Sequence, residues 1–224
     1  MLSEGRLWDH LDEKGHSMTA IIWGELDQRR YENGVDRGVI YPEDDPAVVW
    51  NGLINVAEHF IGGAKTEHFF DGVKYADITS VKNFQATVSA YSFPAVMNDC
   101  LGERPLRPGV FLAKQLRTSF SMSYRTLVNP GDHYKLHMVW NATIARSAEA
   151  HSTIASDTSP TTFSWRLDAT PPPSDFARPT PHMFIDSSKA DSDVLADLET
   201  LLYGTGTVDP IFPTQQEVYE MFNN

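Results

Sequence analysis

YKLHMVWNATI, residues 134–144, is the stretch that decides the fold class, because apolar and polar side chains alternate along it. Successive side chains of a β-strand point to opposite faces of a sheet, so a period of two is typical of a strand with one buried face. The alternation predicts a polar face that includes His137. It also predicts an apolar face made of Tyr134, Leu136, Met138, Trp140, Ala142 and Ile144. A sheet with one covered face is therefore the expected core.

Three other segments show the same period, NFQATVSAYSF at 83–93, TSFSMSYRTLV at 118–128 and TTFSWRLDA at 161–169. Four alternating segments in one chain indicate antiparallel sheets, since such sheets commonly bury one face and expose the other. We therefore predict a mainly β protein with an antiparallel β-sandwich or barrel-like core over residues 18–173. Residues 1–17 are interpreted either as an N-terminal arm or as a stretch upstream of a start at Met18.

Two dipeptides are predicted to form two-residue hairpin turns, Asn33–Gly34 and Asp71–Gly72. Asn, Asp and Gly tolerate the positive φ angles that such turns require. The first turn would place Arg30 and Tyr31 on one arm of a hairpin, opposite Asp36 and Arg37. A structural hairpin is favoured there over a ligand-binding loop, because the surrounding glycines lack the spacing of a nucleotide-binding motif.

The proline-rich stretch TPPPSDFARPTP, residues 170–181, is the clearest boundary in the chain, because proline lacks an N–H donor and fixes its own φ angle. We expect a proline-bounded C-terminal segment, residues 174–224, which begins with a strand at HMFID, residues 182–186. Residues 18–173 are expected to remain a folded core when residues 174–224 are deleted.

Two short helices are predicted to follow that strand. The first would begin at an N-cap, Asp191 or Ser192, and end at Gly204, because Val194, Leu195, Leu198, Leu201 and Leu202 follow the helical period. The second would begin at Thr214, which has Glu217 three residues later and so fits a capping box.

The charge of the chain limits its function. Its 224 residues include 18 Lys and Arg against 30 Asp and Glu, which gives a formal net charge of -12. Such a chain repels phosphate backbones and is a poor binder of nucleic acid, although a surface past which nucleic acid slides fits the same charge. Cys100 is the only cysteine, which excludes an internal disulfide and a cysteine zinc cage. No apolar run approaches the length of about 20 residues that a membrane helix needs.

The search for catalytic motifs gives no candidate. The chain has no P-loop and no G-x-S-x-G elbow. His133 and His137 are four residues apart but lack the glutamate of H-E-x-x-H, which favours a surface or partly buried pair over a metal site. PEDDP, residues 42–46, is interpreted as a solvated loop in preference to a calcium site. We therefore expect no enzyme activity, no cofactor and no metal.

Many short segments, in matching order between about Thr19 and Phe222, resemble the major tail or tail-tube protein family of long-tailed bacteriophages that infect actinobacterial hosts. The resemblance is carried by RRYENGVDRGVIYP (29–42), VVWNGLINVAE (48–58), FFDGVKYADI (69–78), FQATVSAYSFP (84–94), SFSMSYRTLV (119–128), YKLHMVWNATI (134–144), TTFSWRLDATP (161–171), HMFIDSS (182–188) and LETLLYGT (198–205).

The resemblance implies a structural virion protein of the tail, assembled in the host cytoplasm. Its copies would form closed rings that stack into a tube, with the tape-measure and tail-tip proteins as partners. DNA would pass through the lumen without specific binding, and an acidic wall would repel it. The 174–224 segment could clasp the next subunit. The candidate subunit contacts are Arg29, Arg30, Tyr31, Asp36, Arg37 and His137.

Three alternatives remain open from the sequence. One is a ring subunit of the tail tip or baseplate, which the same resemblance also fits. Another is a carbohydrate-binding β-sandwich module that stacks sugars on exposed aromatic rings such as Trp23, Trp50 and Tyr91. The third is a hydrolase whose site residues are too scattered along the chain to recognise.

Overall fold

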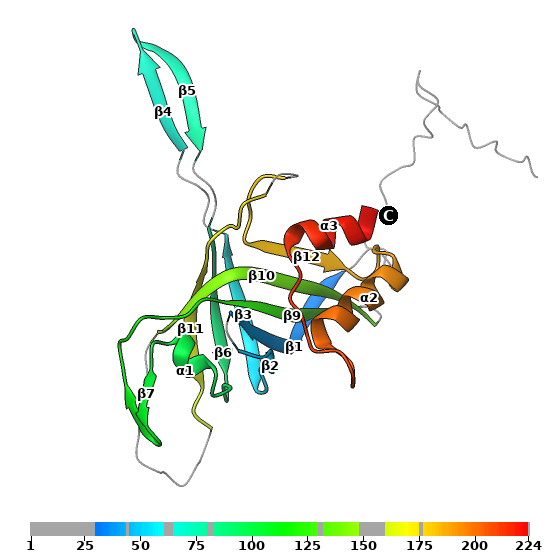
Figure 1. Ribbon diagram of the computed structural model, residues 1–224. Coiled ribbons are helices and arrows are strands. Elements are labelled where there is room, and N and C mark those ends of the chain that lie inside the picture. The colour runs from blue at the N-terminus through cyan, green and yellow to red at the C-terminus, as the bar shows by residue number, and fades with distance from the viewer. Residues whose placement is uncertain are drawn as a thin grey trace, which may run out of the picture.

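The computed structural model describes residues 30–43, 45–60, 65–79, 83–129, 132–147, 160–174 and 177–223. It confirms a mainly β protein of antiparallel strands with short helices near its C-terminus (Figure 1). The proposed arm at residues 1–17 lies outside the described residues, as do Trp23 and Arg29. Among the helices of the described ranges, none is long and apolar enough to cross a membrane.

The main sheet contains eight of the described strands, in the order β2-β1-β9-β10-β11-β6-β3, with β12 paired to β10. Their bounds are β1 Tyr31–Pro42, β2 Val48–Val49, β3 Leu53–Phe60, β6 Phe84–Ala90, β9 Phe120–Asn129, β10 His133–Arg146, β11 Phe163–Ala169 and β12 His182–Asp186. The remaining strands form two separate hairpins, β4 Lys65–Phe70 with β5 Val73–Thr79, and β7 Arg104–Arg107 with β8 Val110–Leu112. The helices are α1 Met97–Cys100, α2 Ser192–Tyr203 and α3 Gln215–Asn223.

The main sheet curls strongly, so that β1, near one edge of the sheet, approaches β3 at the opposite edge. Gly38 on β1 permits this approach, because a Cβ there would lie 2.9 Å from Leu53 Cδ2 on β3. The backbone N–H of Trp50 donates to the Gly38 carbonyl at 2.8 Å and extends the pairing of β1 with β2 toward the start of β3. The enclosed side chains form the first core, in which Trp50 and Trp165 pack edge to face at 5.4 Å. The barrel-like form of the predicted core is therefore present.

The predicted alternation is confirmed on β6 and β11. Phe84, Ala86, Val88 and Ala90 are all buried, and so are Trp165 and Leu167. These side chains belong to the first core, together with Phe120, Met122 and Tyr124 of β9.

The single apolar face predicted for residues 134–144 is wrong, because β10 changes face along its length. Between Val139 and Ala142 the register with β9 shifts by one residue, and Asn141 has a φ of 48°. Such a β-bulge inserts one unpaired residue and moves every later side chain to the other face. Leu136, Met138 and Trp140 lie in a second core, whereas Ala142 and Ile144 lie in the first.

The second core lies between β10 and the C-terminal helices. Leu195, Leu198 and Leu202 of α2 and Val218 of α3 bury the outer face of β1 and β10, and Figure 1 shows both helices beside these strands. Strand β12 is hydrogen-bonded to β10 over residues 182–186. The expectation that residues 18–173 remain folded after deletion of residues 174–224 disagrees with this packing, because the deletion would uncover one face of the sheet.

The ends of the two C-terminal helices agree with the sequence prediction. The Asp191 carboxylate accepts from the N–H groups of Asp193 and Val194, as an N-cap does. Gly204 ends α2 with a φ of 70°. The Thr214 N–H donates to the Glu217 carboxylate at 2.7 Å, and the Glu217 N–H donates to the Thr214 hydroxyl at 3.3 Å. These reciprocal bonds are the predicted capping box.

The two predicted turns have different outcomes. Asp71 and Gly72 both have positive φ angles and join β4 to β5 in a two-residue turn, as predicted. Asn33–Gly34 forms no turn, since β1 continues through it and pairs with β9. Gly34, with a φ of 77°, lies at a β-bulge between Asn33 and Val35. The positive φ at Gly34 was predicted, but its use in a β-bulge instead of a hairpin turn was not.

Replacing Leu198 by alanine tests whether the C-terminal segment is part of the folding unit. Leu198 is fully buried against β10, so L198A should lower the free energy of unfolding by about 2–5 kcal/mol, as measured by chemical denaturation. L116A is the matched control, because Leu116 is 81% exposed. Equal unfolding midpoints for the two variants would show that the helices dock too weakly to support the sheet.

Candidate functional site

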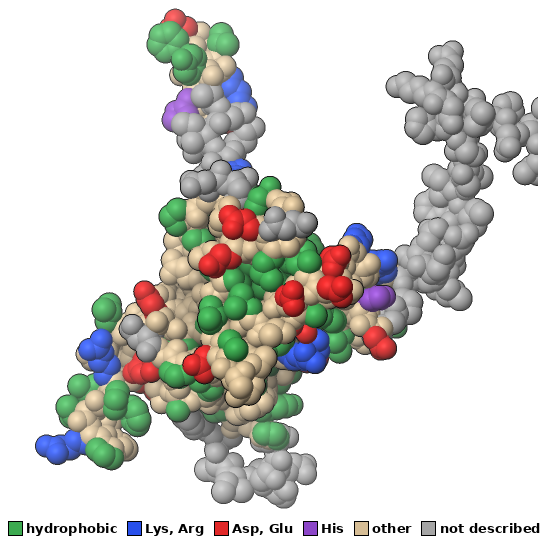
Figure 2. Space-filling view, turned by 45° about the vertical axis from the view of Figure 1, so that its right-hand side comes forward, with side chains coloured by type: hydrophobic (Ala, Val, Ile, Leu, Met, Phe, Trp, Pro, Cys, Tyr) green, Lys and Arg blue, Asp and Glu red, His purple; other side chains and the backbone are tan. Residues whose placement is uncertain are grey.

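The β4–β5 hairpin projects from the body of the protein and carries apolar side chains into solvent (Figures 1 and 2). Phe69, Phe70 and Tyr75 are 64%, 69% and 81% exposed, and Val73 is exposed beside them. The ring centroids of Phe70 and Tyr75 lie 6.4 Å apart. This single ring contact is too small to form a core. Exposed apolar clusters of this kind mark surfaces that other molecules cover.

A second hairpin, β7–β8, presents a similar surface. Its turn at Pro108–Gly109 has a φ of 77° at the glycine, and its exposed apolar side chains are Leu106, Val110, Phe111 and Leu112, followed by Leu116. Figure 2 shows these groups gathered on a protrusion at the lower left of the molecule. The described residues thus include two projecting apolar hairpins.

The segment that contains β7 and β8 is also strongly basic. Residues 104–118 hold Arg104, Arg107, Lys114 and Arg117 and no acidic residue, in a chain whose formal net charge is -12. We name these residues the basic arm. Its exposed strands combine positive charge with apolar surface, a combination suited to an acidic and partly apolar partner.

The C-terminal helices present the opposite charge. Residues 190–223 contain no Lys or Arg, and their acidic side chains are Asp191, Asp193, Asp197, Glu199, Asp209, Glu217 and Glu220. Val208, Ile211 and Tyr219 are exposed among them. We name this surface the acidic helical face, and Figure 2 shows its acidic and apolar groups interspersed. The basic arm and the acidic helical face carry opposite charges and lie on different sides of the body (Figure 1).

Of the predicted subunit contacts, Arg30, Tyr31 and Arg37 are exposed. Arg30 donates to the Ser188 hydroxyl at 3.1 Å and lies 3.8 Å from the Asp186 carboxylate. Tyr31 is exposed at the start of β1. That Arg30, Tyr31 or Arg37 touches a second copy stays a prediction.

Asp36 and Arg37 make contacts within the chain. Both Asp36 oxygens accept from the nearly buried Arg125 guanidinium, at 2.9 and 2.7 Å. Arg37 has a φ of 48°, lies 3.4 Å from the Glu199 carboxylate and stacks over the Tyr203 ring at 5.7 Å. These pairs join β1 to β9 and to α2.

His137 does not lie at the surface, which corrects its assignment as a subunit contact. It is 5% exposed, and its ring stacks on Tyr124 with centroids 4.7 Å apart. The residue belongs to the polar side of the predicted alternation, but the curled sheet encloses that side. Its ring therefore faces other residues of the same chain.

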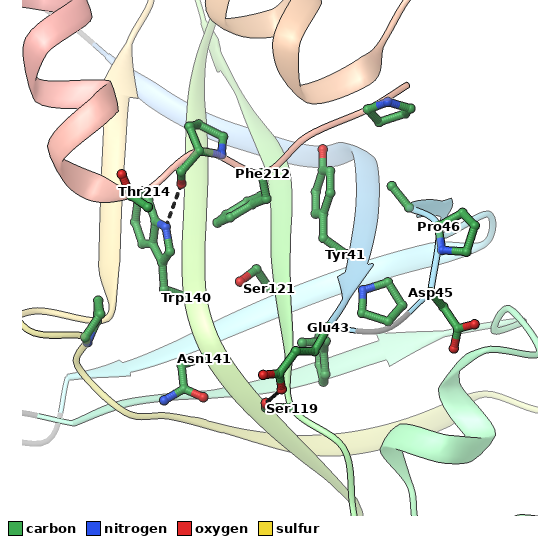
Figure 3. Close-up of a pocket in the computed structure, with 16 residues that line it drawn as sticks. Tyr41, Glu43, Asp45, Pro46, Ser119, Ser121, Trp140, Asn141, Phe212 and Thr214 are labelled. Carbon is green, nitrogen blue, oxygen red and sulfur yellow. Dashed lines mark hydrogen bonds between the residues drawn. The ribbon is translucent and has the colours of Figure 1, made fainter. Parts of the chain in front are cut away.

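Figure 3 shows a pocket of about 460 Å³ between β1, β10 and the segment that leads into α3. Among its polar groups, Trp140 Nε1 donates to the Pro213 carbonyl, and the Ser119 hydroxyl donates to Glu43, both at 2.9 Å. Burial raises the pKa of Tyr41 to about 12, so this phenol is neutral and donates to the Leu202 carbonyl at 2.8 Å. Asp45 points away from Glu43 in Figure 3, and the two carboxylates do not face a common point.

One of the aromatic residues considered for carbohydrate binding is not accessible to a sugar. Trp50 is buried in the first core, and its Nε1 donates to the Ser92 carbonyl at 2.9 Å. A buried indole cannot stack on a sugar. Of the three aromatic residues considered, Tyr91 is exposed and Trp23 lies outside the described residues.

The basic arm was missed in the sequence analysis, although two signals identify it. Pro108–Gly109 is a strong turn dipeptide, and the run of basic residues without an acid contrasts with the rest of the chain. No protein-family model matches this chain, and no curated protein matches it either. Its function is therefore inferred from its own surfaces and contacts.

Asp36→Ala distinguishes a structural role of this residue from a role in subunit contact. Removing the carboxylate leaves Arg125 without its bidentate partner, so the free energy of unfolding should fall by about 1.5–3 kcal/mol. R30A is the control, and its exposed ion pair should contribute no more than about 0.5 kcal/mol. Unchanged stability of D36A, together with weaker self-association, would support the original assignment.

Proposed function

We propose that the protein is a structural subunit that binds copies of itself head to tail, through the basic arm of one copy and the acidic helical face of the next. The observation that carries the proposal is the exposure of apolar side chains on two hairpins that project from a well-packed body. A monomer gains nothing from keeping Phe70, Tyr75 and Phe111 in water, whereas a neighbouring copy that covers them gains free energy by burying apolar surface.

The geometry of such a contact favours a ring. The arm and the helical face are different surfaces on different sides of the molecule, so a contact between them is heterologous. Heterologous contacts repeat from copy to copy, and they form a closed ring when the rotation between copies closes. The β4–β5 hairpin is separate from both surfaces in Figure 1 and is available for contacts between rings.

The assembly that we propose is the tail tube of a long-tailed bacteriophage, in line with the resemblance of the sequence. A chain of net charge -12 suits a conduit through which DNA moves without adhering. A ring of the tail tip or baseplate would use the same surfaces and is the second candidate. The position of the gene relative to that of a tape-measure protein would distinguish these two assemblies.

Charge reversal on the basic arm tests the head-to-tail contact. R104E/R107E should convert rings or tubes of the wild-type protein into monomers, as measured by light scattering after size exclusion and by negative-stain electron microscopy. Adding D193K/D197K to the same chain should restore assembly. The new glutamates of the arm then face the new lysines of the helical face, so the two surfaces attract each other again. R104K/R107K keeps the charge and should assemble as the wild type does.

Two results would contradict the proposal. One is a wild-type protein that stays monomeric at every concentration examined. The other is assembly of R104E/R107E that is as complete as that of R104K/R107K. Circular dichroism of each variant should match that of the wild type, since these arginines are exposed and lie outside both cores.

A further inference from the structure

Three side chains from three different strands converge inside the curled sheet. Glu58 lies on β3, His137 on β10 and His182 on β12. Glu58 Oε1 and His182 Nε2 each lie 3.1 Å from His137 Nδ1. The three atoms lie within 4.8 Å of one another, and each side chain is buried or partly buried. We name this group the Glu-His-His cluster.

The surrounding hydrogen bonds fix which nitrogen of His137 carries the proton. Thr126 Oγ1 lies 2.9 Å from Glu32 Oε2 and 3.0 Å from His137 Nε2. A carboxylate only accepts, so the single hydroxyl proton of Thr126 goes to Glu32. His137 Nε2 must then be the donor to Thr126. In the neutral imidazole this leaves Nδ1 with a lone pair that points toward Glu58 and His182.

The other two members are also held by neighbours. The Tyr124 hydroxyl donates to Glu58 Oε1 at 2.6 Å, and the His182 ring stacks on Phe84 at 4.5 Å. The cluster therefore offers one carboxylate and two imidazoles, which are side-chain types that bind zinc.

We infer that the Glu-His-His cluster binds a divalent transition metal of the zinc class. Two imidazoles and one carboxylate are an established zinc ligand set, with metal–ligand distances of about 2.0–2.2 Å. Ligands at that distance around a tetrahedral ion are separated by about 3.3 Å, close to the two 3.1 Å separations in the cluster. Magnesium and calcium prefer all-oxygen ligand sets and fit the cluster poorly.

The hydrogen bonds that orient the members of the cluster are of the kind found around metal ligands. Ligating histidines usually donate their second nitrogen to a polar partner, which orients the ring, and the His137–Thr126–Glu32 chain does this. A pocket of about 400 Å³ opens beside the cluster and leaves room for a water molecule as fourth ligand. Lys135 lies at this pocket, but its ammonium group is paired with Glu32. The ion would join β3, β10 and β12, and this site is independent of the proposed assembly.

Zinc binding by the full chain tests the inference. After treatment with a chelator, titration calorimetry should show one Zn²⁺ bound per chain and no comparable binding of Mg²⁺. Co²⁺ in the same site should give the intense visible absorption of a tetrahedral ion with nitrogen and oxygen ligands. Zinc should also raise the thermal unfolding temperature, because it binds only the folded site.

Variants separate this site from adventitious binding. E58Q and H182N should each weaken zinc binding by at least about tenfold, and T126V, which removes the partner of His137 Nε2, by about 10–100-fold. H59A and H133A are matched controls, because these histidines are exposed, and they should bind zinc as the wild type does. Circular dichroism checks that each variant is folded. Equal zinc binding by the wild type and by folded E58Q and H182N would overturn the inference, as would loss of binding in H59A or H133A.

Discussion

The β-bulge in β10 is the constraint on which the rest of the structure depends. By inserting one residue between Val139 and Ala142, it allows a single strand to bury Leu136, Met138 and Trp140 on one side of the sheet and Ile144 on the other. The strand pairs with β12 before the bulge and with β11 after it. Without the extra residue, the apolar side chains of β10 would all face one core, and the other would lose its central strand.

The two cores together explain why the candidate functional surfaces are exposed. Helices α2 and α3 bury their leucines on the sheet, and this leaves their acidic side chains toward solvent. The curled sheet fills its own interior with side chains from its strands and from α1, so neither projecting hairpin is needed to complete a core. Apolar groups such as Phe70 and Phe111 are therefore left exposed, and in the assembly that we propose the opposite charges of the arm and the helical face would give the contacts between copies a direction.

The Glu-His-His cluster is a second consequence of the curled sheet. Before the bulge, residues of β10 alternate between the helices and the interior, so His137 points inward beside Tyr124 of β9. Curling brings β3 close enough for Glu58 to meet both residues, and β12 adds His182. Three polar side chains are thus enclosed at the junction of four strands, where buried polar groups require partners. Mutual hydrogen bonds and a bound cation are two ways to supply them.

The sequence by itself determined the features that depend on near neighbours. Strict alternation located β6 and β11, Asp71–Gly72 specified a turn, and Asp191 and Gly204 marked the ends of α2, because in each case the controlling interactions lie within a few residues. Only the tertiary structure decided that Asn33–Gly34 forms a bulge against β9 and that β10 serves two cores, because positive φ angles permit either a turn or a bulge and the partner strand selects between them. The same holds for the Glu-His-His cluster, whose members come from β3, β10 and β12 and have no recognisable spacing along the chain.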